Sequence, residues 1–131
     1  MLHHISIAVT DLAASTAFYD AALLPLGYVQ IWSDDEAVGY GVPGGGDQLA
    51  IKLRENVVIP GEGFHIAFRA PDRESVTRFY EAALAHGGKD NGGSGLHPEY
   101  GDNYWAAFVF DPDGYRIEAV INSLPSPAQA A

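Results

Sequence analysis

The chain has 131 residues, with 17 acidic and 7 basic side chains and a formal charge of −10. This length suits one small domain, or two half-size units that share a core. The negative charge argues against a nucleic-acid partner, because phosphate binding requires a basic surface.

The sequence contains no cysteine. Disulfides, thiolate metal sites and a cysteine nucleophile are therefore excluded, and a reducing cytoplasm is the expected location. We find no apolar run long enough to cross a bilayer and no signal-peptide pattern at the N-terminus. We therefore expect a cytoplasmic protein with no membrane partner.

The first 54 residues predict a strand, a helix and three further strands. Asp11 precedes the helix at the N-cap position, where its carboxylate can accept hydrogen bonds from backbone amides. Pro25 and Gly27 end the helix. The predicted elements are strands at 3–9, 28–32, 37–42 and 49–53, and a helix from 12 to about 24.

Residues 55–63 predict a linker, after which the same order of elements starts again. Asp72 takes the N-cap position of a second helix, and the sequence DPDG at 111–114 is a strong turn signal. A glycine-rich loop is expected at 92–103. The predicted elements are strands at 64–70, 89–91, 104–110 and 115–121, a helix from 73 to about 86, and a frayed tail at 123–131.

One stretch of the sequence occurs twice, at an offset of 61 positions. HISIAVTDLAASTAFYDAAL begins at His4, and HIAFRAPDRESVTRFYEAAL begins at His65. Near the end of each half the offset becomes 66, which aligns Lys52 with Glu118. The repeat predicts an α+β fold in which one domain, residues 1–131, contains two tandem βαβββ modules at 1–54 and 64–122.

Strand alternation divides the side chains between two faces. In the first strand the apolar residues would pack under the helix, and His4, Ser6 and Ala8 would point the other way. The other face of each module would then carry small and ionisable residues, which suggests a cavity. Pseudo-twofold symmetry would bring together four residues, namely His4, Lys52, His65 and Glu118.

Two imidazoles and one carboxylate form a ligand set for a divalent metal ion. His4, His65 and Glu118 would suit Fe, Mn, Ni, Co or Zn. Lys52 leaves two alternatives open. Its ammonium group could pair with Glu118 and replace the metal, or it could serve as an acid–base residue or oxyanion clamp beside a bound metal.

Three segments of the chain resemble the vicinal oxygen chelate superfamily, which includes glyoxalase I, bleomycin-resistance proteins and extradiol dioxygenases. The segments are HISIAVTDLAASTAFY, FHIAFRAPD and FVFDPDGYRIEAV. The resemblance implies a cupped mixed sheet around a central cavity, a homodimer, and metal ligands at His4, His65 and Glu118. Glyoxalase I has a glutamate where this chain has Lys52, so the resemblance implies a different activity.

Four further residues are candidates for substrate binding. Arg69 and Arg116 share the cavity face and could hold an anionic group, or they could pair with local carboxylates. His97 and Tyr104 lie in or beside the glycine-rich loop, which is a candidate lid or a solvated loop.

Two functions are consistent with this pattern. The first is a metal-dependent enzyme that chelates a small oxygenated substrate for lyase, isomerase or ring-cleaving dioxygenase chemistry, with Lys52 and Glu118 as catalytic residues. The alternative is a metal-free protein similar to the bleomycin-resistance members, which would bind a cationic drug through its acidic surface. Its aromatic pocket would contain Trp32, Tyr40, Tyr104 and Trp105.

Overall fold

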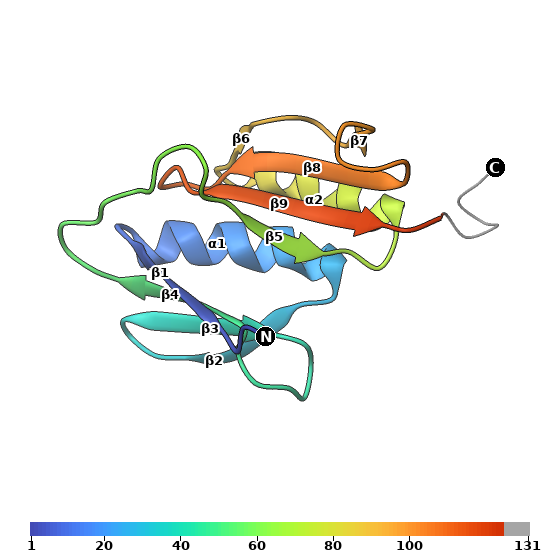
Figure 1. The fold of residues 1–131 in the computed structure, drawn as a ribbon. Helices are drawn as coiled ribbons and strands as arrows, with labels where there is room; N and C mark the ends of the chain where they lie inside the picture. Colours follow the sequence, from blue (N-terminus) through green and yellow to red (C-terminus); the bar gives the residue numbers. More distant parts are fainter. Residues whose placement is uncertain (125–131) are drawn as a thin grey trace.

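The computed structural model describes residues 1–124, so most of the predicted frayed tail lies outside the described residues. In residues 1–124, two α-helices and nine strands follow one another in an order that repeats (Figure 1). The elements are β1 (Ile5–Val9), α1 (Leu12–Leu23), the short 3-10 helix η1 (Leu24–Leu26), β2 (Val29–Ser33), β3 (Ala37–Gly41), β4 (Leu49–Leu53), β5 (Ile66–Arg69), α2 (Arg73–Ala85), β6 (Lys89–Asp90), β7 (Gly95–Leu96), β8 (Tyr104–Phe110) and β9 (Arg116–Asn122).

The strands form two separate mixed sheets. The first has the order β1-β4-β3-β2, and the second has the order β5-β9-β8-β6, with β7 added beside β8. In each sheet the first strand of the module pairs in parallel with the last strand. The α+β fold with repeated modules is therefore confirmed. The second module has one extra short strand, β7, inside the segment predicted as a loop.

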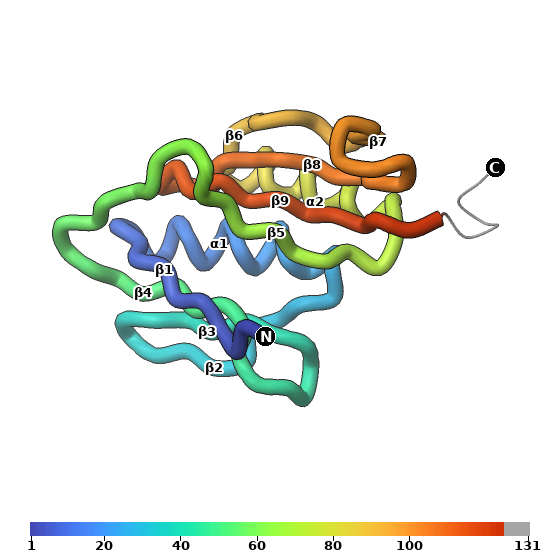
Figure 2. The backbone as a smooth tube through the Cα atoms, viewed as in Figure 1, coloured from blue at the N-terminus to red at the C-terminus, as the bar shows by residue number. Residues whose placement is uncertain are grey.

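The two sheets are open, and they do not curl into the single cup that the family resemblance implied. Strands β1 and β5 are edge strands of different sheets, and no strand ladder in the described part of the chain joins them. The backbone trace shows the two sheets as distinct groups of strands on either side of helix α1 (Figure 2). Within residues 1–124, the sheets therefore form no closed cup, and the space between the modules is an open pocket beside β1 and β5.

The side chains that face the helices form one continuous core. Ile7 and Val9 of the first sheet and Val109 and Ile117 of the second belong to it, and all four are almost fully buried. Phe18, in α1, is fully buried in the same core. Because both modules contribute to this core, neither module buries its apolar face without the other.

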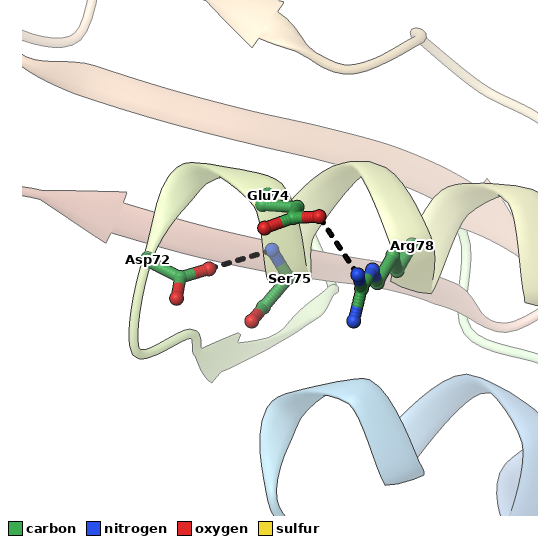
Figure 3. Close-up of polar contacts among 4 residues, drawn as sticks. All are labelled: Asp72, Glu74, Ser75 and Arg78. Atoms are coloured by element: carbon green, nitrogen blue, oxygen red, sulfur yellow. Dashed lines mark hydrogen bonds and ion pairs between the residues drawn. The ribbon is translucent and has the colours of Figure 1, made fainter. Parts of the chain in front are cut away.

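An aspartate caps each helix, as predicted. The Asp11 carboxylate accepts a hydrogen bond from the Ala14 amide at 3.0 Å, and the Asp72 carboxylate accepts one from the Ser75 amide at 2.7 Å (Figure 3). These contacts satisfy amides that have no partner within the helix. The hydrogen bond from Ser75 holds the pKa of Asp72 below its ordinary value.

Polar contacts join the DPDG turn of the second module to the first module. The Asp113 carboxylate accepts hydrogen bonds from the backbone amide and hydroxyl of Thr10. The Tyr19 hydroxyl donates to Asp111 at 2.6 Å, and the Tyr115 hydroxyl donates to the Ala8 carbonyl at 2.7 Å. Burial raises the pKa of Asp111 and of Tyr19. The DPDG turn and Tyr115 therefore form hydrogen bonds that connect the two modules.

Within residues 1–124, no helix is long and apolar enough to cross a membrane.

Candidate functional site

The centre of the site is Glu118, which projects from β9 on the face of the sheet opposite α2. Its side chain is only 1% exposed, and its Oε1 atom lies 3.0 Å from Nε2 of His65. Its Oε2 atom accepts a hydrogen bond from the hydroxyl of Tyr104 in β8. Both carboxylate oxygens therefore have partners, as a buried carboxylate requires. Burial and the neighbouring Glu118 raise the pKa of Tyr104, so its hydroxyl remains a donor at neutral pH.

His65 leaves this pair open to solvent. Its side chain is 52% exposed, although Glu118 behind it is buried. An imidazole nitrogen and a carboxylate oxygen are donors that Fe, Mn, Ni, Co and Zn all accept. The pair therefore fits part of a divalent metal site and lacks at least one further protein ligand.

His4 does not complete the site within one chain. It is exposed at the start of β1, and its Nδ1 atom lies 2.8 Å from Nδ1 of His3. No group of three histidine or acidic side chains among residues 1–124 is placed to hold a metal ion. The described part of a single chain therefore does not bring His4 to His65 and Glu118, and the three-ligand set stays a prediction. The physical reason is that the two sheets stay separate.

The strand register changes the residue that corresponds to Glu118 in the first module. Glu118 lies opposite Ala67 of β5, and the repeat equates Ala67 with Ser6 of β1. The residue opposite Ser6 is Ala50. Ala50 is therefore the structural counterpart of Glu118, and it offers no ligand atom.

Lys52 lies two residues further along β4, opposite Ala8. It is half-buried and belongs to none of the ion pairs found in residues 1–124. Within the described chain Glu118 pairs with His65, and not with Lys52 as one of the two alternatives for Lys52 required. A catalytic role for Lys52 stays a prediction.

An open groove of about 690 Å³ runs along the same face of the second sheet. It passes between Ala67, Tyr104 and Asn122 and includes Arg69. Ala67 is the residue opposite Glu118, and Tyr104 is its hydrogen-bond donor, so the groove adjoins the His65–Glu118 pair. A smaller pocket of about 240 Å³ between β1 and β5 is lined by His4 and also by Arg69.

The other predicted substrate residues lie near Glu118 but differ in their contacts. Arg116 shares the face of Glu118, but its guanidinium lies over the Phe110 ring and donates to the Pro60 carbonyl at 3.4 Å. His97 packs edge-on against Phe108, the residue opposite Glu118. The His97 Nδ1 atom lies 3.1 Å from Glu99, and its buried Nε2 atom has no hydrogen-bond partner among residues 1–124.

The aromatic pocket expected for a drug-binding protein is not assembled. Tyr40 faces the core, where its hydroxyl donates to Asp20 at 2.9 Å. Trp105 belongs to the helix side of the second sheet, and the Arg73 guanidinium lies 4.8 Å from its ring centre. Trp32 lies against Gly39 of the first sheet, so closely that a Cβ atom at residue 39 would be 2.3 Å from the indole nitrogen. The aromatic residues are thus divided among different faces.

Sequence reasoning missed two residues of this face, Phe108 and Asn122. The hairpin made by DPDG pairs Phe110 with Arg116, and counting back along the two strands pairs Phe108 with Glu118 and Tyr104 with Asn122. The turn signal at 111–114 could have located both.

Comparison with solved structures places the chain among similar small proteins. A glyoxalase/bleomycin resistance protein from Albidiferax ferrireducens T118 is 29% identical, with a TM-score of 0.75, and the match covers 89% of this chain and 94% of that one. A putative glyoxalase from Bacillus halodurans is 28% identical, with a TM-score of 0.68, and the match covers 92% of this chain and 94% of that one. A fosfomycin resistance protein from Listeria monocytogenes shares the fold. It is 21% identical, with a TM-score of 0.69, and the match covers 95% of this chain and 94% of that one.

No curated protein matches the sequence. The model of one family, described as the Glyoxalase/Bleomycin resistance protein/Dioxygenase superfamily, matches residues 1–119. That match includes β1 to β8, His65, Glu118 and Tyr104, so it spans both modules and the site. The chain therefore belongs to the Glyoxalase/Bleomycin resistance protein/Dioxygenase superfamily.

Proposed function

We propose that the protein is a metal-dependent enzyme that chelates a small oxygenated substrate, with lyase, isomerase or ring-cleaving dioxygenase chemistry. The observation that carries this proposal is the His65–Glu118 pair at 3.0 Å, which is buried on the carboxylate side and open on the imidazole side. Because Ala50 takes the place corresponding to Glu118, the first module supplies no second carboxylate. This absence argues against the activity of glyoxalase I.

The missing ligand would come from a second copy of the chain. His4, Ser6 and Ala67 are exposed on the open faces of the two sheets. A homodimer that sets the first module of one chain against the second module of the other would cover these faces. It would add the partner subunit's His4 to His65 and Glu118. Such a pairing creates two equivalent sites per dimer.

Each residue at the site has a distinct task in this proposal. A divalent ion held by the three ligands would supply a Lewis acid that stabilises negative charge on chelated substrate oxygens. Tyr104 orients Glu118 by donating to the oxygen that does not face His65. Second-layer hydrogen bonds of this kind fix ligand geometry. Glu118 could also take a substrate proton if it leaves the ligand set.

The proposal is tested by the metal content of protein purified without chelator. We expect about one divalent ion per chain, and a loss of affinity of at least about tenfold in His65→Ala and in Glu118→Gln. Glu99→Gln is a matched control, because Glu99 also pairs with a histidine, at 3.1 Å, but lies in the loop between β7 and β8. Wild-type protein that binds none of Fe, Mn, Ni, Co or Zn would contradict the proposal.

A metal-free binding protein is the second candidate, and one observation favours it. Both oxygens of Glu118 already have protein partners, so the buried carboxylate is satisfied with no metal ion. In that case His65→Ala would destabilise the fold and leave ligand binding unchanged. Metal content decides between the two candidates.

A further inference from the structure

Asn91 has the surroundings in which an asparagine side chain reacts most readily with its own backbone. It is exposed, and Gly92 follows it. The backbone nitrogen of the following residue can attack the side-chain carbonyl of an asparagine, and a glycine leaves the approach unhindered because it has no Cβ atom. The chain has four asparagines, and the other three, Asn56, Asn103 and Asn122, precede valine, tyrosine and serine.

The fold itself requires the glycine at position 92. Gly92 has a φ of 129°, in the region that favours glycine. A Cβ atom there would also lie 3.3 Å from the side chain of Phe108. The Asn91 amide donates to the Phe108 carbonyl at 2.9 Å, and the Phe108 amide donates to the Gly92 carbonyl at 2.8 Å. These two hydrogen bonds attach the turn after β6 to β8, so the reactive pair is a fixed part of the second sheet.

Asp90 restrains the nitrogen that would attack. Its Oδ1 atom accepts a hydrogen bond from the Gly92 amide at 2.9 Å and another from the Tyr80 hydroxyl at 3.0 Å. The attacking nitrogen must lose its proton and turn toward the Asn91 side chain, and a hydrogen bond to a carboxylate opposes both steps. Because β6 is an edge strand of 2 residues, local opening of this turn can still release the amide.

We propose that Asn91 is a site of slow self-modification, in which its link to Gly92 becomes aspartyl or isoaspartyl and Asp90 limits the rate. The Gly92 nitrogen gives its proton to solvent base and forms a bond to the Asn91 Cγ atom. The bond from Cγ to the side-chain nitrogen breaks, and this nitrogen leaves as ammonia with a proton from water. Water then opens the resulting succinimide at either carbonyl, which yields aspartate or isoaspartate. The reaction consumes only water, so the proposal does not depend on the proposed function.

The modification would alter the face that carries Glu118. An isoaspartyl link adds one carbon atom to the backbone between residues 91 and 92, so the two hydrogen bonds to Phe108 can no longer both keep their geometry. Phe108 lies opposite Glu118 and packs against His97. The amide proton of Phe108 should therefore exchange with solvent faster in the isoaspartyl product than in fresh protein. The Asn91→Asp variant, which keeps the backbone length, should exchange as fresh protein does.

The test is to incubate the folded chain at mildly alkaline pH and to map its peptides by mass spectrometry over time. We expect Asn91 to be converted first among the four asparagines, with isoaspartate identified in its peptide by isoaspartyl methyltransferase labelling. Asp90→Ala should raise the rate at Asn91 at least about fivefold, the factor that one ordinary hydrogen bond represents. Tyr80→Phe is the matched control and should react at the wild-type rate, since it removes the other donor to Asp90 and leaves the Gly92 amide bonded.

The remaining asparagines show whether a variant has merely unfolded, because global unfolding would speed every conversion together. Faster reaction at Asn91 alone supports the restraint by Asp90. A comparison that needs no variant is wild-type protein held unfolded in guanidinium chloride, which should convert Asn91 faster than the folded chain does. The proposal is overturned if another asparagine is converted before Asn91, if folded and unfolded protein react at equal rates, or if folded Asp90→Ala reacts at the wild-type rate.

Discussion

At the scale of single residues, the site depends on how Glu118 is held. A buried carboxylate is costly unless hydrogen bonds satisfy it, and Glu118 receives one contact from His65 and one from Tyr104. His65 and Glu118 were predictable, because the repeat and strand alternation place both on one face. The Tyr104 contact was not predictable in this way. Tyr104 lies opposite Asn122, four positions from Glu118, and only the side-chain conformation shows that its hydroxyl reaches the carboxylate.

Tyr104→Phe is expected to lower the free energy of unfolding by about 1–3 kcal/mol, because one oxygen of a buried carboxylate loses its donor. The same change should weaken metal binding by about tenfold, since the ligand is no longer oriented. Urea unfolding and metal titration measure the two effects. Tyr100→Phe is the control, as Tyr100 is exposed beside Tyr104. Equal behaviour of the two variants would show that the hydroxyl of Tyr104 does not hold Glu118.

At the scale of elements, helix boundaries were predictable, and the register of the parallel strand pairs β1–β4 and β5–β9 was not. Asp11 and Asp72 marked both helix starts correctly, because an N-cap is a local interaction. The repeat equated Lys52 with Glu118 at an offset of 66 positions, but the ladders equate Ala50 with Glu118 at 68. The two offsets differ by two residues, and a shift of two along a strand leaves every side chain on the same face. Strand alternation therefore could not choose between them, and only backbone pairing does.

Helix α2 provides a test of the capping argument. Asp72→Ala should lower the free energy of unfolding by about 1 kcal/mol at neutral pH, because the Ser75 amide loses its acceptor. The pKa of Asp72 is lowered in the folded protein from 3.8. Its contribution is therefore fully present above that value and is lost as the pH falls through the lowered pKa.

Urea unfolding of both proteins at pH 7 and at successively lower pH measures this difference. Glu74→Ala is the control in the same turn of the helix, since its exposed pair with Arg78 contributes about 0.5 kcal/mol or less (Figure 3). A difference between Asp72→Ala and the wild type that persists unchanged at the acid end would show that the carboxylate is not the source of the effect.

At the scale of the whole molecule, the repeat predicted two modules and could not predict how they assemble. The DPDG turn ties the modules together through Asp113, Thr10 and Tyr115, and both helices share one core. These contacts leave the two polar faces open. Equivalent residues of a repeat meet only if the two modules face each other. The repeat in the sequence does not reveal whether the facing modules belong to one chain or to two.

The central claim is that each metal site combines His4 of one copy with His65 and Glu118 of the other. It is tested most directly by unfolding equal amounts of His4→Ala and His65→Ala together, refolding them and measuring bound metal. Each variant refolded alone should bind metal at least about tenfold more weakly than the wild type and retain little of it, because every site then lacks a ligand.

In the mixture about half of the dimers are mixed, and one of the two sites in each mixed dimer has all three ligands. We therefore predict about a quarter of the wild-type metal content in the mixture. A mixture that binds no more metal than the separate variants would contradict a site shared between two copies.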